Sequence, residues 1–297
     1  MVSGYLFATD LFEKGQVDIS FRKMVQKKVS RLYPYYIFSL LILAVLLQLR
    51  HLLSLPRLIT DAVGIDIVHL GWAVNTPDWY VVVLFYSELI YFVIFNLIGI
   101  RMRSWQKAMI EVIFFISVSL YFFLIMFNGN CDFWWENTYV IPDGLLRGMC
   151  GIGSGIGLWQ FSRNIKFTAS FRGLLRLIEI VILSLVIFLS YIISWSRLDF
   201  ILIIFMGIGI FIAFHSDMHI SVPGWIKKIS GLTYLAYLLQ AAIIAVFHFV
   251  LGERMFNAFI FTLFCIVAFF SAFVLERVLS VVGNILKKSI IGVLKKE

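Results

Sequence analysis

The sequence predicts an all-α integral membrane protein, a polytopic bundle of about eight transmembrane helices. Of its 297 residues, 61% are hydrophobic and only 14% are charged, and the mean hydropathy is +0.96. Apolar stretches long enough to cross a bilayer, about 20 residues each, recur along the whole chain. A soluble chain of this length buries its apolar surface in cores and keeps a more polar outside. We therefore expect one membrane domain over residues 1–297 and no soluble domain.

The predicted spans follow one another with mostly short connections. They cover residues 33–50, 79–99, 107–127, 145–161, 173–195, 198–214, 229–250 and 257–285. The fourth contains two pairs of glycines spaced four residues apart, Gly151/Gly155 and Gly153/Gly157. Such pairs let helices approach closely. A phosphate-binding loop would need a preceding strand, so this glycine run favours helix packing.

Lys and Arg residues set the direction of the bundle, because cytoplasmic segments of membrane proteins carry an excess of them. If the segment before Tyr33 is cytoplasmic, nineteen of the 25 basic residues fall on the inner side. We therefore expect both termini in the cytoplasm. The net charge of +8 follows from this topology and does not indicate nucleic-acid binding.

A cluster of cations, Lys27, Lys28 and Arg31, comes just before the first predicted span. It has two interpretations. It is a positive-inside anchor that contacts lipid headgroups, or it is a clamp for a phosphorylated cytosolic donor. Arginine suits the second role because its planar fork holds phosphate with two hydrogen bonds.

Glu88 is the most unusual single charge, since it lies nine residues into the span that begins at Trp79. Helix rise places it about 13 Å deep. A carboxylate within the bilayer is costly and should face the bundle interior. It either pairs structurally with a Tyr, Ser or Arg of another helix, or it serves substrate binding or a proton relay.

The other polar and aromatic side chains that suggest a site also have ordinary structural interpretations. His215 and His219 are spaced to share a metal on a helix, but no third ligand is suggested, so we expect no metal site. In the outer loop 128–143, Trp134, Trp135 and Tyr139 suit a membrane interface, with a carbohydrate-stacking platform as the alternative.

Two segments near the start resemble the acyltransferase family 3 membrane proteins. Ser3-Gly4-Tyr5-Leu6 resembles the end of that family's second helix, and MVQKKVSRLYPYY resembles the loop that follows. Later segments are similar to further motifs of the family: PDWY, Arg147 before the glycine-rich helix, ISGLTYLAYLLQ, and a closing Glu-Arg pair. The positions that match are Ser3, Gly4, Tyr5, Lys27, Lys28, Arg31, Pro34, Trp79, Tyr80, Arg147, Tyr234, Gln240 and Glu276. Lys28 stands where the family commonly has Arg.

The resemblance implies a membrane-embedded O-acyltransferase of the bacterial inner membrane. It would move an acyl group, most often acetyl from acetyl-CoA, to a hydroxyl of a glycan or a lipid-linked saccharide, with Lys27, Lys28 and Arg31 binding the donor. Polysaccharide O-acetylation is the expected process. Acetyl-CoA is then a co-substrate, no metal is required, and the partners are the acceptor and membrane lipids.

The resemblance also implies two spans before this chain's first full one, which would make ten. The family's general base is a His in the first of them, and this sequence begins within the second. We therefore expect the catalytic base to be absent from the chain as given, either because translation starts upstream or because the chain is an inactive remnant. The alternative function is a transporter or flippase for a glycan-linked substrate. That alternative predicts inverted repeats, and residues 33–161 and 173–285 show none.

Overall fold

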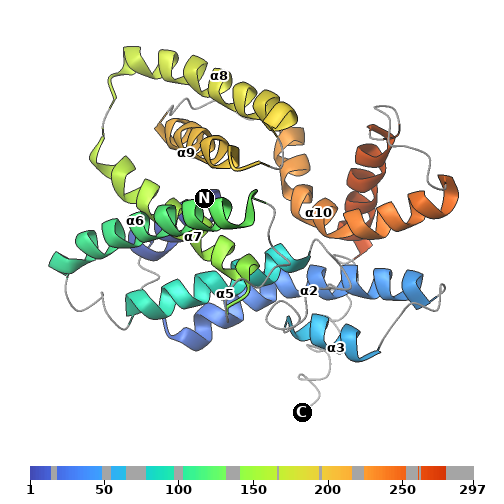
Figure 1. Ribbon diagram of the computed structural model, residues 1–297. Coiled ribbons are helices and arrows are strands. Elements are labelled where there is room, and N and C mark those ends of the chain that lie inside the picture. Colours follow the sequence, from blue (N-terminus) through green and yellow to red (C-terminus); the bar gives the residue numbers. More distant parts are fainter. Residues whose placement is uncertain are drawn as a thin grey trace. The chain divides into compact units, whose positions relative to one another are not determined.

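The computed structural model describes eleven stretches of the chain. They are residues 1–14, 19–48, 55–64, 78–96, 103–131, 141–165, 167–193, 196–215, 224–251, 260 and 262–278. These stretches contain helices and turns and no strand (Figure 1). The prediction of an all-α protein is therefore confirmed for the described residues.

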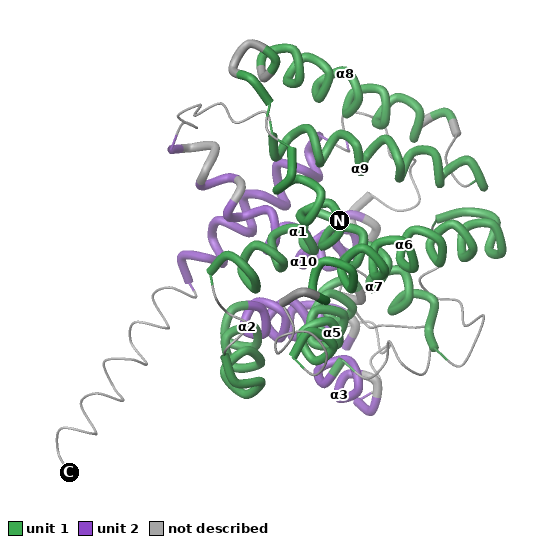
Figure 2. The backbone as a smooth tube through the Cα atoms, turned by 90° about the vertical axis from the view of Figure 1, so that its left-hand side faces the viewer, with its two compact units in different colours: residues 1–31, 64–73, 79–219 green, residues 32–63, 74–78, 220–297 purple. Residues whose placement is uncertain are grey.

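The chain divides into two compact units, coloured separately in Figure 2. Unit 1 comprises residues 1–31, 64–73 and 79–219, and unit 2 comprises 32–63, 74–78 and 220–297. The described helices of unit 1 are α1 (Val2–Ala8), the π-helix η1 (Thr9–Glu13), α5 (Asp78–Ile94), α6 (Arg103–Asn128), α7 (Asp143–Asn164), α8 (Ala169–Ile193) and α9 (Asp199–His215). Unit 2 holds α3 (Leu55–Val63), α10 (Gly224–Leu251) and the helical residues 262–278. The helix α2 (Phe21–Gln48) begins in unit 1 and continues into unit 2.

A helix occupies each of the eight predicted spans, but their lengths differ. Within the described residues, three helices are long and apolar enough to cross a membrane, over Phe21–Leu46, Trp105–Asn128 and Gly173–Ser190. Three shorter apolar helices cover Tyr80–Ile94, Asp199–His215 and Gly231–Phe247. The bundle is thus a helical membrane protein, and the count of eight spans stays a prediction.

The helix α8 shows why the fold needs a lipid environment. Its side chains form a broad apolar surface that the rest of the protein leaves uncovered: Leu174, Leu177, Ile180, Val181, Ile187, Phe188 and Ile192. In water such a surface would drive aggregation, whereas hydrocarbon solvates it at no cost. Its backbone groups bond within the helix, which is what a lipid-facing segment requires.

The glycine-rich helix α7 lies at the centre of unit 1, between α1 and α6. A Cβ added at Gly155 would meet the carbonyl oxygen of Met1, the residue before α1, at 2.0 Å, and one at Gly153 would meet Ser117 Oγ of α6 at 2.0 Å. Gly157 lies as closely against Phe114 of α6. The two glycine pairs therefore serve two neighbours, and the prediction that they allow close packing is confirmed.

The structure changes the expected limits of two segments. The sequence predicts a span from Tyr33, but α2 begins twelve residues earlier, at Phe21. Lys, Arg, Gln and Met favour helix, and no glycine interrupts them. Pro34 therefore lies inside α2, where it removes one backbone hydrogen bond and does not end the helix.

The second change is in the segment 51–78 between the first two predicted spans, which contains the helix α3. Its apolar residues recur at the spacing of one helix face, namely Leu55, Leu58, Ile59, Ala62 and Val63. The hydroxyls of Tyr33 and Tyr36 in α2 donate hydrogen bonds to the carbonyls of Ala62 and Asp61. These bonds attach α3 to the part of α2 in unit 2.

Candidate functional site

Five charged side chains of unit 1 gather where α2, α5 and η1 approach one another. Lys28 and Arg31 come from α2, Glu88 from α5, and Asp10 and Lys14 from η1 and its end. Under them lies an apolar core that includes Phe7 and Leu11 of α1 and η1, Met24 of α2, Phe92 of α5 and Ile152 of α7. We call these five charged residues the charged cluster.

The centre of the charged cluster is an ion pair between α2 and α5. Lys28 Nζ lies 2.5 Å from Glu88 Oε2, and the two side chains are 21% and 5% exposed. Phe7 lies beneath the ammonium, with its ring centre 6.0 Å from Nζ. A carboxylate this deeply buried needs a cation, because an unpaired charge would cost several kcal/mol. Lys28 therefore neutralises Glu88.

This pair answers two questions that the sequence left open. Glu88 does face the interior and does pair with another helix, but its partner is a lysine rather than Tyr, Ser or Arg. Since the two side chains touch, Lys28 of α2 lies at the same level along the helices as Glu88 of α5. The basic stretch is thus part of a helix that is long and apolar enough to span, and it is not a loop ahead of that helix.

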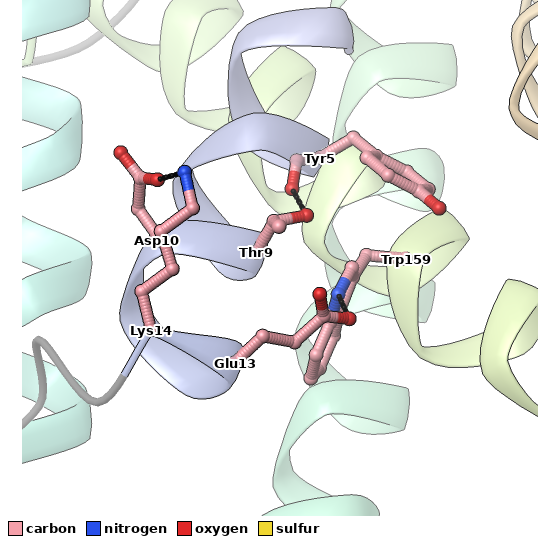
Figure 3. A network of polar contacts seen from close by, with 6 residues as sticks. All are labelled: Tyr5, Thr9, Asp10, Glu13, Lys14 and Trp159. Carbon is pink, nitrogen blue, oxygen red and sulfur yellow. Dashed lines mark hydrogen bonds and ion pairs between the residues drawn. The ribbon is translucent and has the colours of Figure 1, made fainter.

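The other members of the charged cluster surround this pair. The charges of Arg31 and Asp10 both act on Glu88. Asp10 in turn accepts a hydrogen bond from Lys14 at 2.7 Å, as Figure 3 shows. Arg31 and Lys27 are exposed and stand one helical turn apart on α2. Three cations against two carboxylates leave the cluster net positive, and Lys27 adds to that charge.

A π-helical turn carries Asp10 into the charged cluster. The amide of Lys14 donates to the Thr9 carbonyl five residues back, at 3.3 Å, and Thr9 Oγ1 donates to the Tyr5 carbonyl at 3.1 Å. Glu13, on the same turn, accepts from Trp159 Nε1 of α7 at 3.0 Å (Figure 3). π-Helical turns are rare and recur at functional sites. Here the turn is anchored to α7 by Glu13 and presents Asp10 toward α5.

A second polar network lies at the end of α7 and α9. Tyr5 donates to Ser162 Oγ at 2.9 Å and stacks on Phe214 with ring centres 3.6 Å apart. His215 has Nδ1 2.7 Å from the Phe211 carbonyl and Nε2 3.0 Å from the Ser162 carbonyl. Both ring nitrogens face carbonyl oxygens, and a neutral ring donates to one of them at a time, so these contacts hold the ring between α9 and the end of α7.

Other residues picked out by the sequence serve helix packing. Ser3 Oγ lies 3.3 Å from the Tyr80 hydroxyl, which joins α1 to α5. Gly4 is buried against α7, where an added Cβ would meet the Ile152 carbonyl oxygen at 2.1 Å. Arg147 on α7 hydrogen-bonds Tyr121 of α6. The side chain of Trp79 and the whole of His219 lie outside the described residues, as do Trp134, Trp135 and Tyr139.

The remaining motif residues belong to unit 2, whereas the charged cluster belongs to unit 1. Tyr234 of α10 donates to the Leu32 carbonyl at 3.4 Å and stands edge-on to Tyr35. Gln240 is half-buried on α10, and Glu276 is exposed on the helix 262–278. Pro34 is exposed within α2. Within the described residues no group of three potential metal ligands comes together.

Sequence reasoning missed Asp10, Lys14 and Glu13. The spacing of Asp10 and Lys14, four residues apart on a helix, was a visible signal for their ion pair. The contact of Glu13 with Trp159 joins residues far apart in the chain, and no local pattern indicates it.

Comparison with known proteins identifies the family. The family model of the acyltransferase domain of acyltransferase family 3 matches residues 1–277, nearly the whole chain. No curated protein and no solved structure gives a significant match. The matched region includes the described helices up to residue 277 and the whole charged cluster. This chain therefore belongs to acyltransferase family 3, a family of membrane acyltransferases.

Proposed function

We propose that the protein is a membrane-embedded O-acyltransferase that takes an acyl group from acyl-CoA, with acetyl-CoA as the expected donor. The observation that carries this proposal is the net positive charged cluster, set into a family-3 acyltransferase domain. Coenzyme A carries phosphates, and a partly desolvated group of Lys and Arg side chains is a suitable site for them.

Within this proposal the three basic residues of α2 have separate roles. Arg31 and Lys27 are exposed and meet the phosphates first. Lys28 is held by Glu88, so its charge is partly satisfied before the donor arrives. Glu88 is then a positioning residue that keeps the Lys28 ammonium pointing at the site, and a phosphate would share Lys28 with it.

The acceptor we propose is a hydroxyl of a glycan or lipid-linked saccharide, and the location is the cytoplasmic membrane with both termini inside. Transfer to a hydroxyl requires a base. Glu88 holds Lys28 until the donor binds, and it takes the proton of the acceptor hydroxyl once a donor phosphate has drawn Lys28 away from it. The family match favours an acyltransferase over the transporter hypothesis.

The test is donor binding to the purified chain, measured with labelled acetyl-CoA. Arg31→Ala should weaken binding about tenfold or more, because hydrogen bonds to charged groups contribute about 1.5–3 kcal/mol each. Arg31→Lys should retain part of the affinity. Binding should also weaken as ionic strength rises.

Two controls separate a phosphate clamp from a general effect of charge. Lys107→Ala removes an exposed cation of α6, outside the charged cluster, and should leave donor binding unchanged. S-Acetylpantetheine has the thioester without the CoA phosphates, so Arg31→Ala should not alter its binding. Equal losses for both ligands, or no loss for acetyl-CoA, would rule out the clamp.

A further inference from the structure

The helix α2 is anchored in unit 1 over its first part and in unit 2 over the rest (Figure 2). In unit 1, Met24 is buried in the apolar core and Lys28 pairs with Glu88 of α5. In unit 2, the Leu32 carbonyl accepts a hydrogen bond from Tyr234 of α10 at 3.4 Å. The division between the two units falls between these anchor points. Any movement of one unit against the other therefore has to bend α2 between Lys28 and Leu32.

Three residues lie between the two anchor points, Val29, Ser30 and Arg31, and we call them the hinge segment. All three are exposed, whereas the flanking Lys28 and Leu32 are half-buried. A stretch with few packed side chains changes its backbone at a lower cost in free energy than a stretch inside a core. The hinge segment is therefore the part of α2 between the anchor points that packing resists least.

Two hydrogen-bonding features weaken α2 at the same turn. Pro34 has no N–H, so it cannot donate the helical hydrogen bond to the Ser30 carbonyl. Ser30 Oγ donates to the Lys27 carbonyl at 3.1 Å, the acceptor that an α-helix assigns to the Arg31 amide. Prolines and side chains that enter the hydrogen-bond ladder are the usual causes of bends in helices. Exposure and hydrogen bonding thus point to the same few residues.

We propose that α2 bends at the hinge segment when the acyl donor binds, so that donor binding in unit 1 moves unit 2. This inference rests on the phosphate clamp of the proposed function. Arg31 belongs to the hinge segment, and Lys28 is the unit 1 anchor point beside it. A donor phosphate that draws Lys28 away from Glu88 removes this anchor point, and α2 is then free to bend. The donor binds the bent state better, which is what a ligand-driven change requires.

Distances between spin labels test the hinge in the purified full chain. In a background without the native cysteines, Val112→Cys of α6 and Val246→Cys of α10 place one label on each unit, both at exposed positions. Saturating acetyl-CoA should change the distance between these labels by more than about 2 Å. Val112→Cys paired with Ile187→Cys of α8 lies within unit 1, and its distance should stay the same.

Pro34→Ala tests the hinge segment itself. It gives residue 34 an N–H for the Ser30 carbonyl, so α2 should become stiffer and the distance change should fall by about half or more. Pro56→Ala is the matched control, because a proline in the first turn of α3 replaces an N–H that has no acceptor within the helix. The control should keep the full change. Bound acetyl-CoA is measured on the same samples, so that weaker donor binding is not mistaken for a stiffer helix.

Glu88→Gln separates the hinge from the phosphate clamp. It removes the anchor point at Lys28 without any donor. The unliganded variant should therefore already show the changed distance between unit 1 and unit 2. Adding Pro34→Ala to Glu88→Gln should return this distance toward that of the unchanged protein.

Two outcomes would overturn the proposal. One is a distance between the units that neither saturating acetyl-CoA nor Glu88→Gln changes. The other is a change that Pro34→Ala leaves at its full size. A protein that does not bind acetyl-CoA would refute the phosphate clamp and the donor's part in this proposal, whereas Glu88→Gln with and without Pro34→Ala would still decide the hinge.

Discussion

At the scale of single residues, the structure assigns Lys28 and Glu88 to one another. Each had a separate interpretation in the sequence, a headgroup or donor contact for Lys28 and an interior carboxylate for Glu88. Their separation of 2.5 Å makes the two roles dependent, because neither charge can be removed without leaving the other in a mostly apolar setting.

A double-mutant cycle measures this dependence. Glu88→Gln should lower the melting temperature in detergent, because it leaves the partly buried Lys28 ammonium without its counter-charge. The unfolding free energy should fall by up to about 3 kcal/mol. Lys28→Met alone should be destabilising for the converse reason. The double variant should be more stable than either single one. Simply additive losses would show that the pair is not coupled.

Another residue-scale prediction concerns the two tyrosines that hold α3. Tyr36 is buried and Tyr33 is 39% exposed, and both donate to neighbouring carbonyls. Tyr36→Phe leaves a buried carbonyl without its donor and should cost about 1–3 kcal/mol. Tyr33→Phe should cost less, because water can replace the lost bond. Thermal unfolding of both variants checks the order, and a reversed order would contradict it.

At the scale of elements, α7 organises unit 1 because its glycines let two helices approach on different sides. α1 contacts it through Gly4 and Gly155, and α6 through Gly153 and Gly157. Close approach replaces the hydrophobic driving force, which is absent between helices in lipid, with dense van der Waals contact.

Gly4→Ala tests this packing directly. Its new Cβ would lie 2.1 Å from a backbone oxygen of α7, which cannot turn aside as a side chain could. We expect a loss of about 1–3 kcal/mol, typical of overpacking, seen as a lower melting temperature. The matched control Gly173→Ala, in open space on α8, should be neutral or stabilising by up to about 1 kcal/mol. Equal effects of the two changes would rule out close packing of α1 on α7.

At the scale of the whole molecule, the family match and the apolar helices make this a membrane protein, and its orientation is still a prediction from charge. Single cysteines can test it. In a background lacking Cys131, Cys150 and Cys265, Glu136→Cys should react in intact cells with a thiol reagent that cannot cross membranes. Asn164→Cys should react only after the cells are broken. The opposite pattern would place the amino end outside.

The sequence by itself determined the helical class, the position of a helix at each predicted span, the glycine pairs of α7 and the family motifs. These properties are local, because hydropathy, glycine spacing and motif order are all read along the chain. Only the tertiary structure decided that α2 carries Lys28 to Glu88, that His215 lies between the Phe211 and Ser162 carbonyls, and that Glu13 meets Trp159 of α7. Such contacts join side chains from distant helices, and the way those helices pack has no local signal in the sequence.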